Sequence, residues 1–287
     1  MFVWMLRFKK QFLLSFGIIL IGINHFNAFI PLRLNKEKIH ETVKESPNQL
    51  KLLSYNVRLF NIYDWLSKPG ANQDILNFIR SERPDIICIQ EFYSSTDKEY
   101  QPDKIKKFFS GTPYSYIHYT YKNKNNTGHG IATFSRYPII NKGVISFPNT
   151  SNEAIYTDIL YLKDTIRVYN NHLQSVQLQR RNYNFLDTIR LRYDDDQIRE
   201  VKDISKRLKK AYIKRSTQVD SISKHIRSSK YPVIVCGDFN DTPVSYSYRK
   251  MGKGLKDAFL SSGQGTGSTY SGIFPYFRID YIFHDKE

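Results

Sequence analysis

The sequence predicts an α/β fold, because short apolar strands alternate along the chain with segments of helical spacing. Val233–Val235 is a β-branched run typical of a buried strand. Ile75, Leu76 and Ile79 share one face of a helix predicted over residues 72–82. The 287 residues fit one large domain or two small ones, and an apolar content of 40% is enough for a core.

The same two patterns recur along the rest of the chain. Residues 94–126 are polar and aromatic, and we expect only a helix in them, with a turn over residues 123–128. Further strands are predicted over residues 50–57, 85–91, 129–139, 154–162, 167–173 and 278–283, and further helices over residues 103–109, 195–229 and 255–259.

The segment after Val233–Val235 carries the first candidate site residues. We expect Gly237 to break the strand. Asp238 and Asn240 are two residues apart, so in extended backbone they would point the same way. Such groups at the end of a buried strand are placed for chemistry at the rim of a sheet. The alternative is an Asx-turn, in which both side chains bond their own backbone.

Other predicted strands also carry polar residues. Asn56, Glu91 and His172 each stand at or near the end of a strand. Burying Glu91 is costly without a partner, so we expect an ion or cation beside it, the alternative being a solvated strand end. Asp280 lies inside an apolar strand, where Arg278, on the same face, is expected to supply the compensating charge.

These side chains are hard oxygen ligands together with one imidazole. Carboxylate and amide oxygens suit Mg²⁺ or Mn²⁺ better than zinc. A divalent ion held by a carboxylate, a His donor and an Asp are the groups needed to activate water against a phosphorus centre. The sequence has no Gly-rich phosphate loop, no Gly-Xaa-Ser-Xaa-Gly motif and no zinc motif.

Six segments, in order, resemble the endonuclease/exonuclease/phosphatase superfamily, the fold of pancreatic deoxyribonuclease. The resemblance runs from about residue 50 to the end, and parts of it look similar to membrane-anchored members from Bacteroidetes-type bacteria. It implies a four-layer α/β/β/α sandwich, with two packed mixed sheets flanked by helices. The segments are Ser54–Asn56, Ile89–Glu91, Ile131–Ile139, Asn170–Leu173, Gly237–Asn240 and Arg278–Ile282.

The resemblance also implies roles for the strand-end residues. Glu91, helped by Asn56, would hold Mg²⁺ (or Mn²⁺). Asp238 would position or deprotonate the attacking water, and Asn240 would hydrogen-bond the phosphate. His172 would donate a hydrogen bond to a phosphate oxygen. The implied activity is hydrolysis of a phosphate ester, whether a phospholipid, a nucleic acid or a sugar phosphate.

The C-terminal end departs from the family pattern. Asp280 would orient a catalytic His, which family members carry in a later Ser-Asp-His segment. No such segment follows here, and we interpret His284 as structural. The sequence is therefore expected either to be a truncation of a longer protein or to lack this His and its last strands. Loss of a catalytic acid or base costs about 10²–10⁴ in rate.

The N-terminal segment has the pattern of a signal sequence or a membrane anchor. Basic residues precede an apolar run over residues 12–23, and residues 26–32 extend that run towards the length of a span, about 20 residues. We expect an uncleaved anchor with its N-terminus inside the cell, since positive charge stays on the cytoplasmic side. A cleaved signal is the second interpretation, and a buried soluble helix is the third.

Three regions follow from these patterns. Residues 1–32 form the anchor or signal segment, residues 33–49 a polar linker, and residues 50–287 the endonuclease/exonuclease/phosphatase domain, incomplete at its C-terminus. The catalytic domain is then expected outside the cytoplasm, as a membrane-anchored monomer. Cys88 and Cys236 fit small buried hydrophobes, and they form no disulfide framework.

The chain is strongly basic, with a net charge of +16. This charge favours polyanionic partners such as nucleic acid or an anionic membrane surface. The predicted helix over residues 195–229 is either a solvated amphipathic helix or a basic surface for phosphates and headgroups. The predicted function is Mg²⁺-dependent hydrolysis of phosphate esters. The alternative is an inactive, membrane-associated remnant that binds polyanions through the basic helix.

Overall fold

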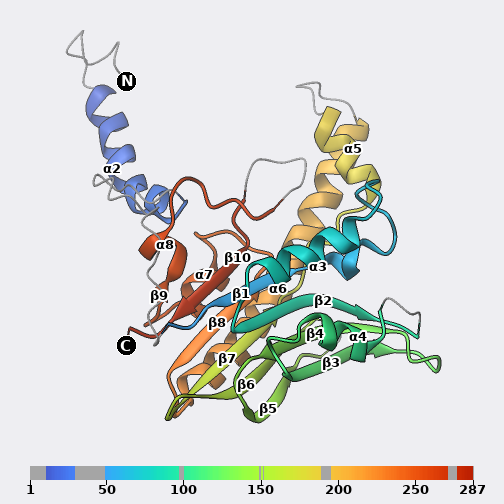
Figure 1. Ribbon diagram of the computed structural model, residues 1–287. Coiled ribbons are helices and arrows are strands. Elements are labelled where there is room, and N and C mark those ends of the chain that lie inside the picture. The colour runs from blue at the N-terminus through green and yellow to red at the C-terminus, as the bar shows by residue number, and fades with distance from the viewer. Residues whose placement is uncertain are drawn as a thin grey trace.

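The computed structural model contains two mixed β-sheets that pack face to face, with helices on their outer faces (Figure 1). The predicted α/β class with two sheets is therefore confirmed. The structure describes residues 11–29, 49–96, 100–148, 150, 152–188, 195–270 and 277–286.

The first sheet has the order β1-β2-β4-β3. Strand β1 (Leu52–Asn56) runs parallel to β2 (Ile86–Ser94), so the carboxyl ends of both strands lie at the same edge. The hairpin of β3 (Tyr114–Lys122) and β4 (Gly128–Ser135) continues the sheet in antiparallel pairing. The 3₁₀ turn η1 (Arg58–Asn61) directly follows β1.

The second sheet has the order β5-β6-β7-β8-β10-β9. Strands β7 and β8 are parallel, and the other neighbours are antiparallel. The strands are β5 (Ile139–Ser146), β6 (Glu153–Tyr161), β7 (Asp164–His172), β8 (Val233–Asp238), β9 (Lys256–Asp257) and β10 (Asp280–His284).

Three apolar clusters separate the layers. The cluster between the sheets includes both cysteines, which are buried and free, as predicted. Helices α3 and α4 cover the first sheet, and α6 and α7 cover the second. The helices are α2 (Gln11–Phe29), α3 (Ala71–Ser81), α4 (Pro102–Phe108), α5 (Arg180–Thr188), α6 (Asp195–Arg227), α7 (Tyr246–Met251) and α8 (Ala258–Ser262).

Three strands were not predicted, and one of them, β9, lies within the helix predicted over residues 255–259. The segment that forms β3 was expected to contain no strand, and β5 follows what was interpreted as a closing turn at Pro138. Strands β3 and β5 lie at the outer end of their sheets and are largely solvent-accessible. The Tyr-rich composition of β3 and the polar centre of β5 therefore lack the continuous apolar run that identifies a buried strand.

The prediction that Gly237 breaks its strand is wrong, since β8 continues through Gly237 to Asp238. Its φ is 127°, a conformation that side chains rarely adopt, and a Cβ atom there would collide with the backbone of Asn171 on β7. The glycine therefore permits the close approach of β7 and β8 immediately before their last residues.

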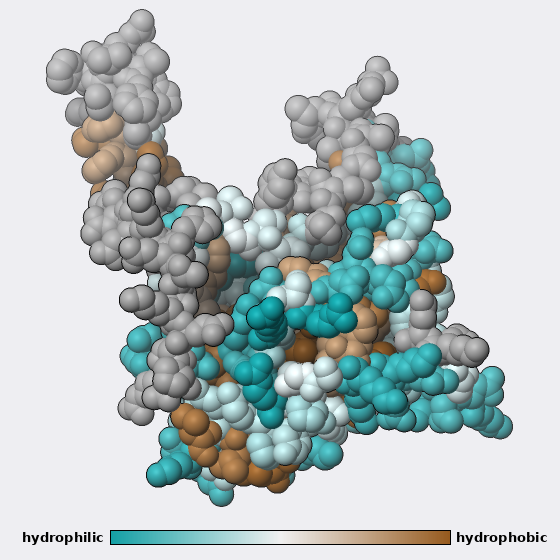
Figure 2. Space-filling model, viewed as in Figure 1, coloured by the Kyte–Doolittle hydropathy of each residue, from teal (hydrophilic) through white to brown (hydrophobic). Residues whose placement is uncertain are grey.

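Helix α2 occupies much of the predicted anchor. No helix in the described part of the chain is both long enough and apolar enough to cross a membrane, so the predicted span is not found there. Residues 1–10 and 30–32 of that prediction, and nearly all of the predicted linker, lie outside the described residues. Seven large apolar side chains of α2 are exposed, and the helix is brown and tan in Figure 2.

Candidate active site

Three of the predicted site residues lie side by side at one end of the second sheet. Asp238, the last residue of β8, pairs in register with His172 on β7 and with Asp280 on β10. Neighbouring strands are about 4.8 Å apart, and register partners face the same side of a sheet. The pairing of β7, β8 and β10 thus brings together two acids and one imidazole from distant parts of the sequence.

The first sheet contributes Asn56 and Glu91 to the same place. Asn56 donates from Nδ2 to Glu91 Oε1 and to Asp238 Oδ2, at 3.0 Å in each case. Glu91 Oε1 is 3.7 Å from His172 Nε2. One amide therefore links carboxylates from both sheets. The protein neighbours of Glu91 here are an amide and an imidazole, and the expected ion or cation beside it stays a prediction.

A β-bulge directs Glu91 into the site. The register of β2 with β4 shifts between Ile89 and Phe92, and Glu91 has a φ of 50°. A bulge turns a side chain away from the regular alternation of a strand, and a non-glycine residue with positive φ is strained by about 1–3 kcal/mol. The fold holds Glu91 in this conformation beside Asn56 and His172.

The Asx-turn interpretation of this segment holds for Asp238 only. The backbone N–H of Asn240 donates to Asp238 Oδ1 at 2.7 Å, and the φ of Asn240 is 51°. Its side-chain amide donates to the carbonyl of Leu173 at 3.0 Å. Asn240 also lines the pocket described below. Its role towards a phosphate stays a prediction.

Burial governs the protonation of these groups. Burial raises the pKa of Asp238 to about 6, against the hydrogen bonds from Asn56 and Asn240. Burial also raises the pKa of Asp280 to about 7, and the negative charge of Asp238 adds to this shift. Burial lowers the pKa of His172, although the charges of Glu91 and Asp280 oppose the change. His172 is therefore neutral at pH 7, and the acids compete for ionisation.

The donor set fits a magnesium ion with few protein ligands. Mg²⁺ keeps several waters and takes one or two carboxylates, so the Glu91 carboxylate suits it. Asn56 presents its Nδ2 to Glu91, whereas its Oδ1 accepts from the backbone N–H of Arg58, so the amide would have to turn over to add its oxygen. The carboxyls of Glu91, Asp238 and Asp280 also interact with one another electrostatically, and a cation would relieve their repulsion. Within the described residues, no group of three or more His, Cys, Asp and Glu side chains forms a metal cluster.

The predicted partnership of Arg278 with Asp280 is wrong. Arg278 is buried and its Nη1 lies 2.7 Å from Asp257 Oδ2. Asp257 comes from β9, the strand on the other side of β10, and its pairing with Arg278 could not be inferred from local spacing. The Nδ1 of His284 donates to the backbone carbonyl of its neighbour Asp285 at 2.6 Å, a contact that fits its interpretation as structural.

The site opens into a pocket of about 1080 Å³. Its wall contains Asn56, Glu91, Asp238, Asn240 and Asp280, whereas His172 contacts this group through Glu91. Sequence reasoning missed other residues that line the pocket. Four of them are Arg58, Trp65, Tyr183 and Tyr270, and the Arg58 guanidinium lies 4.8 Å from the centre of the Trp65 ring.

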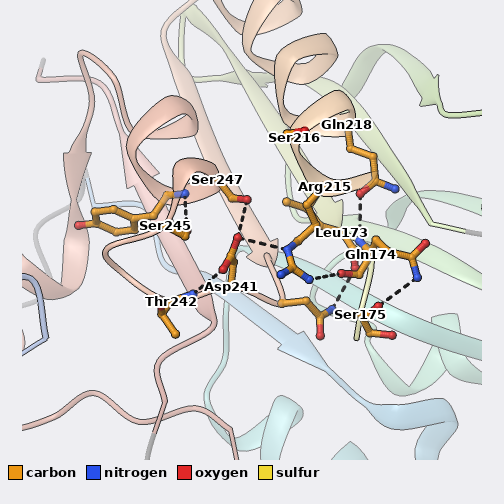
Figure 3. Close-up of polar contacts among 12 residues, drawn as sticks. Leu173, Gln174, Ser175, Arg215, Ser216, Gln218, Asp241, Thr242, Ser245 and Ser247 are labelled. Carbon is orange, nitrogen blue, oxygen red and sulfur yellow. Dashed lines mark hydrogen bonds and ion pairs between the residues drawn. The ribbon is translucent and has the colours of Figure 1, made fainter. Parts of the chain in front are cut away.

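A buried ion pair supports the two loops that follow β7 and β8 (Figure 3). Arg215, on α6, is 1% exposed. Its Nε lies 3.2 Å from Asp241 Oδ2, and its Nη1 donates to the carbonyl of Gln174 at 2.7 Å. Asp241 directly follows Asn240, and Gln174 lies two residues after His172. One guanidinium therefore holds both site-bearing loops.

Further hydrogen bonds complete this network. Ser247 Oγ donates to Asp241 Oδ2 at 2.8 Å, and the Tyr281 hydroxyl donates to the Asp241 carbonyl at 2.8 Å. Arg215 belongs to the helix that the sequence predicts to be basic and solvated, yet its own side chain is buried. Its spacing of four residues from both Ala211 and Val219, which are buried, is the signal that places Arg215 on the inner face.

The sequence matches the model of the Endonuclease/Exonuclease/phosphatase family over residues 53–209 and 218–287. The chain belongs to this family. Members of the family are nucleases, phosphatases and other hydrolases of phosphate esters, and they generally depend on a divalent metal ion. A search of curated protein sequences finds no significant match.

Solved structures of this family share the fold. A family protein from Leptotrichia buccalis has a TM-score of 0.54 at 16% identity and is matched over 83% of this chain and 88% of that one. Sphingomyelinase C from Streptomyces griseocarneus has a TM-score of 0.51 at 16% identity, over 83% of this chain and 84% of that one. A humanised TDP2 from D. rerio has a TM-score of 0.54 at 16% identity, over 82% of this chain and 83% of that one.

Replacing Arg215 by Met should destabilise the protein by about 3–5 kcal/mol, because the Asp241 carboxylate stays buried without its cation. Urea unfolding monitored by circular dichroism measures the change. Adding Asp241→Asn to this variant should recover part of the loss, since it removes the uncompensated charge.

Arg181→Met is the matched control, because Arg181 pairs with Asp203 at an exposed position. Its cost should stay within about 1 kcal/mol. Equal costs for the Arg181 and Arg215 variants would contradict the assigned role of the buried pair.

The stability of the metal-free protein should depend on the ionisation of Asp280. Its folded pKa of about 7 lies above the unfolded value, so the folded state loses stability as pH rises from about 4 to 7. Asp280→Asn removes this loss. The stability of the variant relative to wild type should thus increase by about 1–2 kcal/mol between pH 5 and pH 8, after allowance for screening.

Thermal and urea unfolding in the presence of EDTA measure this difference at both pH values. Asp164→Asn is the control, because Asp164 is an exposed carboxylate at the other end of the same sheet. A pH-independent difference between Asp280→Asn and wild type would show that Asp280 has an ordinary pKa.

Proposed function

We propose that this protein is a Mg²⁺-dependent hydrolase of phosphate esters. The observation that carries the proposal is the meeting of Glu91, His172 and Asp238 at one rim, within hydrogen-bonding or ion-pairing reach through Asn56. These residues come from both sheets, and they adjoin a pocket large enough for a substrate. A merely structural cluster would not need to border such a pocket.

The chain's own residues can perform distinct parts of the reaction. Above about pH 6, Asp238 is ionised and can accept the proton of the attacking water at a carboxylate oxygen. His172 is neutral, and its side chain is 21% accessible, so an imidazole N–H can donate to a phosphate oxygen. Glu91 and Asn56 would hold the metal ion, which supplies positive charge to the phosphate when bound.

Glu91→Gln should lower Mg²⁺-dependent hydrolysis of bis-p-nitrophenyl phosphate at least 10²-fold and weaken Mg²⁺ binding, because one metal-binding carboxylate is lost. Release of p-nitrophenol and calorimetric titration of Mg²⁺ measure the two effects. Glu82→Gln, at an exposed surface ion pair with Lys51, should leave both unchanged.

The alternative function gives a different result in the same experiments. An inactive remnant would bind no Mg²⁺, and its association with DNA would be sequence-independent and would weaken steeply with salt. The exposed lysines of α6 are the feature that favours this alternative. Hydrolysis that is insensitive to both Mg²⁺ and Glu91→Gln would also contradict the proposed function.

We further propose that the protein associates with membranes through its N-terminal segment and that its catalytic domain acts outside the cytoplasm. Supporting this, α2 exposes Leu14 and Ile18, one turn apart, by 69% and 62%, and other apolar side chains beside them. The net charge of +16 suits an anionic lipid surface.

The full chain should float with phosphatidylglycerol vesicles on a sucrose gradient. A double variant, Leu14→Asp with Ile18→Asp, should lose most of this binding, because it places charge on the apolar face. Leu162→Asp, at an exposed turn between β6 and β7, is the control and should still float. Flotation of both variants alike would exclude α2 as the contact.

A further inference from the structure

A second cavity lies beside the catalytic pocket. Its volume is about 490 Å³, within the range of about 300–1,000 Å³ found for small-molecule sites. Helices α5 and α6 form part of its wall, and loop segments form the rest. Both cavities are lined by Tyr183, Asn240, Tyr270 and Ile279, so one wall serves the two.

The lining of this cavity is mainly apolar. Ile204, Leu208 and Tyr212 repeat every four residues and so share one face of α6. Unlike the core residues, these side chains stay partly accessible, and they belong to none of the three packed clusters of the fold. Other apolar lining residues with the same properties are Val176, Leu178, Leu186 and Phe277.

Several polar residues of the cavity are engaged with the protein itself. Arg215 and Asp241 pair with each other, and Asn240 donates to Leu173. Tyr270 hydrogen-bonds with Tyr183. The pKa of Tyr270 is raised to about 12, mainly by burial and to a lesser degree by this hydrogen bond. The two tyrosines line both the polar pocket and the apolar cavity, with their rings available for apolar contact.

We propose that this cavity takes the hydrocarbon chain of an amphiphilic phosphate ester whose phosphate binds at Glu91 and Asp238. The inference rests on the proposed function and names its substrate class. A polynucleotide would place further phosphates along the protein surface, and these would need cationic side chains as partners. The wall of this cavity presents mainly aliphatic and aromatic side chains instead. A sugar phosphate would leave the same side chains in contact with water. The hydrocarbon chain of an amphiphilic phosphate ester would cover these side chains, and its binding would gain the hydrophobic free energy of their burial.

Calorimetric titration of the full chain, in the presence of Mg²⁺, tests this assignment with methyl, butyl, octyl and dodecyl phosphate below their micelle-forming concentrations. The dissociation constant should fall about two- to fourfold for each added methylene until the chain fills the cavity. Equal affinity for methyl and dodecyl phosphate would overturn the proposal.

Leu208→Trp should abolish the gain with chain length, because the indole fills the cavity, while affinity for methyl phosphate and hydrolysis of bis-p-nitrophenyl phosphate stay unchanged. Ile213→Trp is the matched control on the same helix, since Ile213 is 60% exposed and does not line the cavity. This control should keep the full gain. A gain that survives Leu208→Trp would place the chain elsewhere and overturn the proposal.

If Leu208→Trp loses its folded circular dichroism signal, Leu208→Asn gives the same test, because it makes the wall polar without adding volume.

Two further outcomes distinguish this inference from the proposed function. If neither inorganic phosphate nor any alkyl phosphate binds in the presence of Mg²⁺, the proposed function fails and this inference fails with it. If inorganic phosphate binds and chain length has no effect, only the apolar cavity assignment is overturned.

Discussion

The ion pair of Arg215 with Asp241 is the interaction on which the arrangement of the site depends. Both partners are almost completely buried, so each charge needs the other. The same guanidinium holds the carbonyl of Gln174, which ties the loop after His172 to the loop after Asp238. Because strands β7 and β8 end in register, a support placed just beyond their ends fixes both site-bearing loops at once.

A second constraint is electrostatic. Asp238 and Asp280 face each other across β8 and β10, and burial raises the pKa of both. Asn56 bridges Glu91 and Asp238 without adding charge. The rim is therefore stable as a set of neighbouring acids only when some are protonated or when a cation shares the site. This property suits a pocket that binds a metal ion and then a phosphate.

The surroundings of the rim divide by polarity. Arg58 and Trp65 border the catalytic pocket, whereas Ile204 and Leu208 border the adjoining cavity. Helices α5 and α6 extend past the sheets in Figure 1, so their inner faces have no strand to pack against there. An amphiphilic phosphate ester would match both halves of this surface. The exposed apolar side chains of α2 fit the proposed association with a lipid surface.

The sequence by itself determined the α/β class, most of the strands and helices, and the places of Asn56, His172 and Asp238 at the ends of their strands. These features are local, because apolar runs and helical spacing are repeated over a few residues. Glu91, predicted to end its strand, lies inside β2 at a bulge, and Asp280, predicted inside its strand, begins β10. Only the tertiary structure decided that Arg278 pairs with Asp257 and that Arg215 is buried. The partner of a buried charge depends on which strands and helices become neighbours. Strand pairing and helix packing between distant parts of the chain determine those neighbours.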